Sequence, residues 1–423
     1  MELKTKYQHT YFIKPFLIKE NKYEKYLLRL IKNKNCELKI FEKERDLNIY
    51  THFLQEVRDY FFPSFEFSKE KTKKLAHMED KMKASILSKL NSNVFEYKLE
   101  DEIQGKINLK ESKGIFFNIS KIEIICFDTG ICFFIMKTII EGDRDFSEVL
   151  DFNYKFKDIN SDYYKLKAYN NIKIQTDKFG NMKVLSNFIN RLIGTDTNFL
   201  DNKDLDIFNK RFFTYSYACI DQANWSDVNT FENIEEEFLK FTKILPKNYN
   251  PNMNTEEIDN KDLVFSKYEY ARFGFKKESA TFFASNVDIK NYTNLLFKYE
   301  NEYLYTLIIS LYQRIYLKKI NMKFKSKKEI KETMRKFTEF TKNAWLNEIT
   351  NSETGTGFYN NWEKVYELKE LYNEIKMRFD VVYKEASIDK NFILNKILLI
   401  CLGVSIFLNI FNLIMIIRLG GTH

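Results

Sequence analysis

The C-terminal stretch is the feature of this sequence that most constrains the fold. Between Lys396 and Arg418 lie 21 residues without a formal charge, in a chain of which 30% of the residues are charged. As a helix, this stretch rises about 31 Å, close to the thickness of the hydrocarbon core of a bilayer. A helix in a soluble core is rarely apolar on all sides for this length. Residues 396–418 are therefore predicted to form a transmembrane helix.

The residues that flank this helix predict its orientation. Lys384, Lys390 and Lys396 precede it, whereas only Arg418 follows it. Such an excess of basic residues is typical of the cytoplasmic side of a membrane helix. The N-terminus has no basic region followed by a long apolar run, so no signal peptide is predicted. We therefore expect a single-pass protein of the cell inner (plasma) membrane, with the bulk of the chain in the cytoplasm.

Three polar residues interrupt the apolar tail, namely Ser405, Asn409 and Asn412. Their i, i+4, i+7 spacing places them within about 60° of one another around a helix. Polar side chains that face lipid are costly, so this polar stripe should face another helix or water. Apart from chance, two roles remain open: hydrogen bonds between the helices of an oligomer, or the lining of a pore. Both roles require a homo-oligomer in the lipid bilayer.

Residues 1–250 carry signals for both strands and helices, which predicts a cytoplasmic α/β domain within an overall α+β fold. Lys121–Ile140 is typical of a β-hairpin, because two β-rich runs flank Asp128-Thr129-Gly130 and glycine supplies the positive φ of a turn. Three further signals are a turn, a strand and a helix that Pro63 ends: Gly180-Asn181, Arg211–Ile220 and Ile40–Phe61.

The next part of the chain is predicted to be helical. A loop rich in Pro, Asn and Asp, Pro246–Asp262, separates it from the first domain. Beyond this loop, Asn291–Ile320 and Lys327–Thr350 have helical periodicity without glycine or proline. Residues 263–350 are therefore assigned to a helical layer.

Residues 358–395 are predicted to form a stalk helix that continues into the membrane helix. Neither glycine nor proline occurs between Asn360 and Leu402, and an unbroken helix from Asn360 to Arg418 would be about 90 Å long. This apolar seam either forms a coiled coil with another copy or packs on the two preceding helices. Its residues alternate at spacings of three and four: Val365, Leu368, Tyr372, Ile375, Phe379, Val382 and Ala386.

No motif in the sequence predicts catalysis. The four histidines form neither an HExxH motif nor a Cys/His cluster, so no metal site is predicted. No P-loop, GxGxxG or GxSxG motif occurs, and we expect no enzyme. The formal charge of +8 arises from 67 Lys+Arg and 59 Asp+Glu that are interspersed along the chain. They predict no single basic face, so no direct nucleic-acid partner is expected.

Four arginines lie in apolar or aromatic surroundings in the sequence, namely Arg58, Arg211, Arg272 and Arg314. Arginine stacks on aromatic rings and pairs with phosphates or carboxylates, so these residues are candidates for a ligand-binding site. Internal ion pairs that tie helices together are the alternative role for each of them.

The order of these features resembles that of the CorA-type divalent-cation channels, with a cytoplasmic α/β domain, a helical layer, a long stalk helix and a C-terminal membrane segment. Five segments are similar to a divergent CorA-like group in bacteria: "VRDYFFPS", "IEIICFDTGICFF", "RFFTYSYACID", "SLYQRIYLKK" and "NEITNSETGTGFYNNW". Some members of that group are encoded beside type III CRISPR systems as membrane effectors.

The resemblance implies a homo-oligomer, pentameric in the family, whose stalk helices form a funnel and whose membrane helix lines the pore. It also implies that the cytoplasmic domain senses a nucleotide-derived second messenger made on phage infection, and that the effector then disturbs the membrane. In CorA-type channels the cation would be magnesium. Those channels have two membrane helices with Gly-Met-Asn after the first, whereas this sequence reads "RLGGTH" and stops. Either the chain is truncated, or it is a single-pass relative.

We therefore expect an oligomeric membrane effector or ion channel that a cytoplasmic small molecule gates in antiphage defence. The alternatives are a non-conducting, membrane-anchored interaction scaffold and a CorA-like transporter of magnesium or other divalent cations.

Overall fold

Apolar strands from distant parts of the chain form one large sheet at the centre of the fold. The computed structural model describes residues 3–99, 103–107, 114–142, 144–158, 172–175, 184–195, 197–201, 211–249, 263–322 and 327–420. In these ranges the sheet has 12 strands, and nine of them follow the order β10–β11–β12–β9–β1–β6–β5–β3–β2. Their bounds are Leu263–Phe265, Ala271–Lys276, Ser279–Ser285, Phe213–Ile220, Lys4–Leu17, Ile131–Ile140, Ile115–Phe127, Ser92–Tyr97 and Cys36–Lys39.

Three short strands complete the sheet beside this path. β4 (Ile103–Ile107) pairs with β5 and with β8 (Lys173–Gln175), and β7 (Arg144–Asp145) pairs with β1. The neighbours are antiparallel except for β12 and β9, which run parallel. The result confirms the expected mixture of strands and helices, in the form of one large sheet with many helices.

The predicted hairpin and strand are both present. β5 and β6 flank the turn at Asp128-Thr129-Gly130, and Gly130 has a φ of +79°. A side chain at Gly130 would collide with the carbonyl oxygen of Ile18, so glycine is required there for space as well as for conformation. The strand predicted at Arg211–Ile220 is β9. The turn signal at Gly180-Asn181 and most of the loop Pro246–Asp262 lie outside the described residues.

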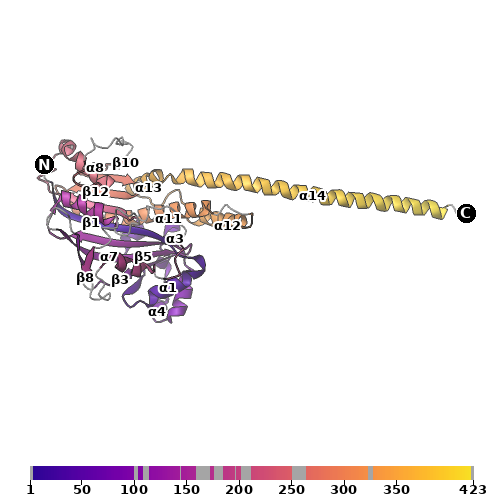
Figure 1. Ribbon diagram of the computed structural model, residues 1–423, viewed down its shortest axis with the longest axis horizontal. Helices are drawn as coiled ribbons and strands as arrows, with labels where there is room; N and C mark the ends of the chain where they lie inside the picture. Colours follow the sequence, from indigo (N-terminus) through magenta and orange to yellow (C-terminus); the bar gives the residue numbers. More distant parts are fainter. Residues whose placement is uncertain are drawn as a thin grey trace.

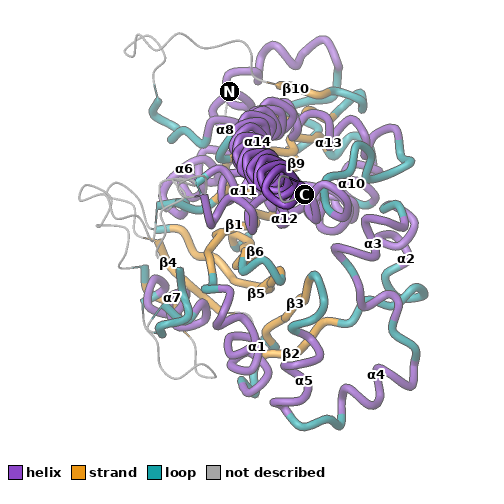
Figure 2. The backbone as a smooth tube through the Cα atoms, turned by 90° about the vertical axis from the view of Figure 1, so that its right-hand side faces the viewer, coloured by secondary structure: helices purple, strands orange, loops and turns teal. Residues whose placement is uncertain are grey.

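Two apolar cores lie on the two faces of the sheet, and Figure 2 shows the strands between helices. The first core joins the sheet to α2 (Leu47–His52), α3 (Gln55–Phe61), α10 (Asn294–Lys298), α11 (Leu304–Asn321), α12 (Lys327–Asn343), α13 (Glu353–Tyr366) and the start of α14 (Leu368–Gly420). The second core is covered by α1 (Tyr23–Lys32), α4 (Lys69–Ala76), α5 (Asp80–Leu87), α6 (Phe146–Phe156), α7 (Leu185–Ile193) and α8 (Glu235–Lys243). The C-terminal helices therefore share a face of the sheet with the segment α2–α3.

The expectation that helix begins at residue 263 is wrong. Residues 263–285 contain β10, β11 and β12, which extend the sheet beside β9. Their apolar side chains, among them Phe273 and Phe282, are buried against the first core. The aromatic runs of this segment pack on a pleated surface, which favours strand over helix.

Two of the predicted helices are interrupted. Ile40–Phe61 is divided into α2 and α3, because the extended residue Phe53 bridges to Thr350 and the amide of Leu54 donates to the carbonyl oxygen of Ile349 (3.0 Å). Asn291–Ile320 comprises the end of α9 (Ile289–Tyr292), then α10, a π-helical turn at Tyr299–Tyr303 and α11. Lys327–Thr350 is helical only as far as Asn343.

The stalk helix begins later than predicted, at Leu368 instead of residue 358 or Asn360. Glu367 ends α13 in the left-handed conformation, with a φ of +52°, so the chain changes direction there. Beyond this break, α14 continues for 53 residues without interruption and projects from the body of the protein (Figure 1). The stalk and the apolar tail are thus one helix, although it does not include Asn360.

Substitution of Phe358 tests how much the packing of α13 on the sheet contributes to stability. Its ring stacks on Tyr303 (4.1 Å between centroids) and Phe282 (5.4 Å), and it is 1% exposed. We expect Phe358→Ala to lower the free energy of unfolding by about 3–5 kcal/mol, because it leaves a cavity in the core. Chemical unfolding in detergent micelles, followed by tryptophan fluorescence, would measure this loss. The control Phe297→Ala, at a ring that is 53% exposed, should change stability by about 0.5 kcal/mol or less.

Candidate functional site

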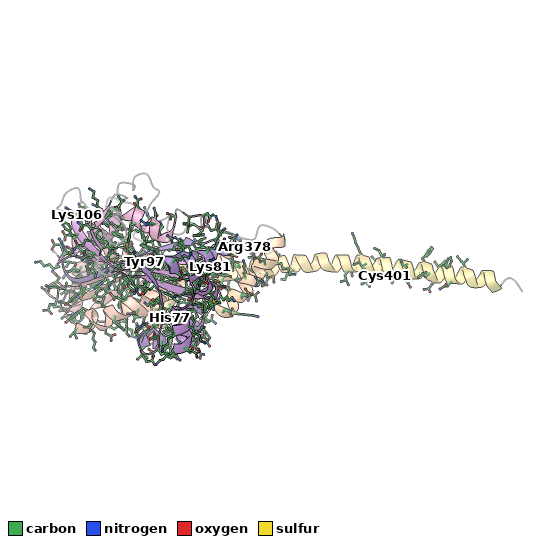
Figure 3. The ribbon with its side chains drawn as sticks, turned by 90° about the horizontal axis from the view of Figure 1, so that it is seen from below. His77, Lys81, Tyr97, Lys106, Arg378 and Cys401 are labelled. Carbon is green, nitrogen blue, oxygen red and sulfur yellow. The ribbon has the colours of Figure 1, made fainter. Side chains whose placement is uncertain are left out.

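The apolar half of α14 is long and apolar enough to cross a membrane. This segment, Leu394–Asn412, comprises 19 residues, none of which is buried within the protein. Figure 3 shows Cys401 on this part of the helix, well beyond the body of the protein. Exposed Leu, Ile and Phe side chains surround the helix on all sides, and water would solvate them at a large cost. Insertion into lipid removes this cost, and the helix satisfies its own backbone hydrogen bonds.

The polar stripe lies within this segment. Ser405, Asn409 and Asn412 are all exposed, and the helix is regular through them. Their side chains therefore fall on one side of α14. This geometry suits either hydrogen bonds between membrane helices or a polar pore wall.

The first turns of α14 pack on the two preceding long helices of the same chain. Tyr372 stacks on Trp345 (4.5 Å between centroids), and Phe379 stacks on Phe337 of α12 (5.0 Å). Arg378 donates to the side-chain oxygen of Asn321 at the end of α11 (2.7 Å), where α14 leaves the body in Figure 3. Of the two partners considered for the seam, the preceding helices are therefore confirmed for residues 368–379. This part of the seam is buried without a second copy.

Glu367 connects the stalk to the sheet. Its carboxylate pairs with Lys277 (3.4 Å), which lies in the turn between β11 and β12. In the first turn of α14, Lys369 pairs with Glu363 across the break (2.6 Å). The chain therefore changes direction before α14 at a left-handed residue, with ion pairs on both sides of it.

Contacts within the protein hold each of the four candidate arginines, which lie on different elements. Arg58 on α3 donates to the carbonyl oxygen of Tyr50 (2.8 Å) and stacks on its ring. Arg211, before β9, pairs with Asp158 (2.8 Å). Arg272 on β11 donates to three backbone carbonyls, including that of Tyr268 (3.2 Å). Arg314 on α11 lies over the ring of Tyr366 (4.7 Å). An ion pair was the alternative role, and Arg211 has one; their role in ligand binding stays a prediction.

A buried charge cluster on the sheet was not predicted from the sequence. Glu123 on β5 is 1% exposed, and its Oε1 accepts from Lys39 and Lys121, each at 3.0 Å. The ammonium of Lys39 also lies 3.4 Å from the hydroxyl of Tyr305 on α11. Burial by itself would raise the pKa of Glu123, but Lys121 and Lys39 outweigh it and lower the pKa to about 2. This carboxylate therefore stays ionised in the core.

A second charged group surrounds the π-helical turn. Glu300 lies 3.5 Å from Nδ1 of His9 on β1 and 2.5 Å from the ammonium of Lys137 on β6. Burial, and then the charge of Lys137, lower the pKa of His9 to about 3. Glu302, two residues later, lies 3.2 Å from Nδ1 of His52 on α2. Single-turn π-helices occur frequently at functional sites, so this turn is a structural indication that the sequence did not provide.

The π-helical turn joins the sheet to the helices that carry the stalk. Tyr299 stacks on Tyr215 of β9 with an interplanar angle of 2°, and Tyr215 donates to the carbonyl oxygen of Tyr299 (3.0 Å). Tyr303, at its other end, stacks on Phe358 of α13. The π-helical turn therefore contacts both the sheet and α13, the helix that ends at Glu367.

Comparison with known proteins found no match for this chain among family models, curated proteins or solved structures. The physical signals of function are therefore the buried charge, the π-helical turn, the break at Glu367 and the polar stripe. The sequence indicated the stripe alone. The charge cluster has a local signal in the sequence, because Lys121 and Glu123 are the two charged residues of β5.

Glu367→Gly and Glu367→Ala form a matched pair that tests the break before α14. At a left-handed position, glycine avoids the clash of Cβ with the backbone. We expect Glu367→Gly to be more stable than Glu367→Ala by about 1 kcal/mol. At Glu370, an exposed residue inside α14, the alanine variant should instead be more stable than the glycine variant, by about 1 kcal/mol. Thermal unfolding in detergent would measure the stability of all four variants. If alanine is more stable than glycine at both positions, the left-handed conformation of Glu367 is contradicted.

Glu123→Gln tests the buried charge cluster through its pH dependence. Removing the charge leaves Lys39 and Lys121 without their shared partner, which should cost about 3 kcal/mol at neutral pH. The pKa of Glu123 is lowered from 4.5 to about 2, so its ion pairs stabilise the fold above pH about 4.5. This contribution is lost as the pH falls toward 2. Chemical unfolding over this range should therefore show the wild type and the variant converging, whereas exposed Glu44→Gln should match the wild type throughout.

Proposed function

We propose that the protein is an oligomeric membrane effector or ion channel, resembling the CorA-type channels, in the inner (plasma) membrane. The observation that carries this proposal is the continuity of α14. Its first turns are buried against α11 and α12, and its last turns expose an apolar surface of membrane-spanning length. A movement of the cytoplasmic domain would therefore reach the membrane through one helix without a flexible joint.

The polar stripe supports an oligomer. A single helix with Ser405, Asn409 and Asn412 facing lipid would leave three polar side chains without partners in hydrocarbon. Several copies that place the stripe at their common axis would supply either partners or water. A pentamer is the arrangement that the resemblance to CorA suggests.

The cytoplasmic domain is the sensor in this proposal. Its charges at Glu123, Glu300 and Glu302 lie where the sheet meets the helices that hold the stalk. Replacing a whole buried ion pair by apolar residues of similar volume is often neutral for stability, so the buried cluster at Glu123 favours a role in setting conformation. The signal would be a small, nucleotide-derived molecule produced during phage infection, as in the CorA-like effectors that the sequence resembles.

A membrane-anchored scaffold is the alternative, and the break at Glu367 is compatible with it, because a fixed stalk also holds a domain away from the membrane. Replacing Leu394–Asn412 by an unrelated transmembrane helix separates the two functions. Loss of activity in cells with retained membrane localisation is expected for an effector. Retained activity would favour the scaffold.

Flux from liposomes tests the proposed role of the stripe. We expect wild-type protein to release ions or a dye, and Asn409→Leu/Asn412→Leu to reduce this release at least about tenfold, since an apolar pore wall does not solvate ions. The matched control is Phe407→Leu/Ile414→Leu, on the opposite side of the helix, which should release as the wild type does. Equal leakage from wild type and the stripe variant would rule out conduction along the stripe.

A further inference from the structure

A cavity of about 390 Å³ lies between α6 and α8, on the face of the sheet opposite to α11. Its volume is within the range of small-molecule sites. Leu3, Phe146 and Leu150 form an apolar part of its lining, and both helices contribute charged side chains. The cavity is separate from the charge clusters near the π-helical turn, because its apolar residues belong to the second core.

The two lysines at this cavity have ion-pair partners, whereas two of its carboxylates have none among the described residues. Lys240 pairs with Glu236 (2.7 Å), and Lys247 lies 4.0 Å from Asp151, so both cations have a carboxylate nearby. Asp145 and Glu237 also line the cavity. Within the described part of the chain, neither of these two carboxylates has an ion-pair partner, and Asp145 does not cap α6 with its side chain. The lining therefore carries two carboxylates and two ammonium groups, and each ammonium group has a further carboxylate, Glu236 or Asp151, beside it.

The wall that carries Lys247 is fixed by the fold. Ile244 ends α8 in the left-handed conformation, with a φ of +51°, which is unusual for a β-branched residue. The chain then turns back toward α6, where the amide of Lys247 donates to Asp151 (3.0 Å). Lys157 holds the turn from the other side, by donating to the carbonyl oxygen of Ile244 (3.3 Å). Lys247 thus stands at the edge of a preformed cavity.

We propose that this cavity binds a small organic cation, with an ammonium group between Asp145 and Glu237 and an apolar portion against Leu3, Phe146 and Leu150. The two unpaired carboxylates supply charge-assisted acceptors for the ammonium. A ligand that also carries an anionic group would direct it toward Lys247, whose ion pair with Asp151 is long. Two classes of ligand carry such an ammonium group, namely simple amines and zwitterions.

The cavity is also connected to the stalk. Ser279 on β12 donates to the carbonyl oxygen of Thr242 on α8 (2.6 Å), and β12 begins beside the turn whose Lys277 pairs with Glu367. A shift of α8 on ligand binding would therefore reach the break before α14. This regulatory consequence rests on the proposed function, whereas ligand binding itself does not.

Titration calorimetry with the full chain in detergent micelles tests the binding. The probes are butylamine, putrescine and γ-aminobutyrate, with butanol as the uncharged control. We expect at least one amine to bind and butanol not to bind. Asp145→Asn/Glu237→Gln should weaken the amine at least about tenfold, whereas Glu232→Gln, an exposed residue before α8, should leave its affinity unchanged. Tight binding of γ-aminobutyrate alone would identify the zwitterion.

A second variant guards against misfolding of the first. Ser147→Phe places a ring in the cavity from the first turn of α6, and it should abolish amine binding without lowering the unfolding temperature. The proposal is overturned if none of the probes binds at millimolar concentration, or if both variants bind as the wild type does. Liposome flux, measured separately, distinguishes this outcome from a failure of the proposed function. A protein that conducts ions but binds no amine would contradict only the proposed ligand site.

Discussion

The structure depends on how one helix is divided between two environments. The first turns of α14 bury Leu368, Ile375 and Phe379 in the core of the body, and the following turns leave it altogether. No second helix of the described chain accompanies the apolar part, so lipid or other copies must cover it. The position of the body relative to the membrane is therefore decided at the few turns where α14 meets α11 and α12.

Buried charge is the second constraint, because it fixes where the helices may sit on the sheet. Two lysines share one oxygen of Glu123, and removal of any member would leave a charge in the core. Glu300 and Glu302 both belong to the π-helical turn. The carboxylate of Glu300 contacts β1 and β6, and the carboxylate of Glu302 contacts α2. Such a turn cannot slide along the sheet without breaking the ion pair of Glu300 with Lys137 and the contacts of the two carboxylates with His9 and His52.

The sequence predicted those features that local signals specify. The β5–β6 hairpin and β9 carry β-rich runs, and the hairpin also has a glycine turn, while the apolar tail is defined by its length alone. The strands at 263–285 were not predicted, because they follow a boundary loop and join the sheet by pairing with β9, which is distant in sequence. The cluster at Glu123 depends on Lys39 from another strand, and no spacing rule connects the two. The break at Glu367 was missed because glutamate is a good helix former, and burial of Tyr366 and Leu368 on either side imposes the turn.

The heptad seam shows why a periodic pattern predicts burial better than it predicts the partner. Within residues 368–379 the seam faces α11 and α12, so these residues are not available to a second copy. Copies of the stalk that meet along residues 368–379 would therefore use another side of α14. Met377 and Val381 lie outside the packed side and remain exposed, and the polar stripe further along the helix is exposed as well. An assembly that uses these surfaces would leave the contact between α14 and its own body intact, which allows each body to act on its own membrane helix.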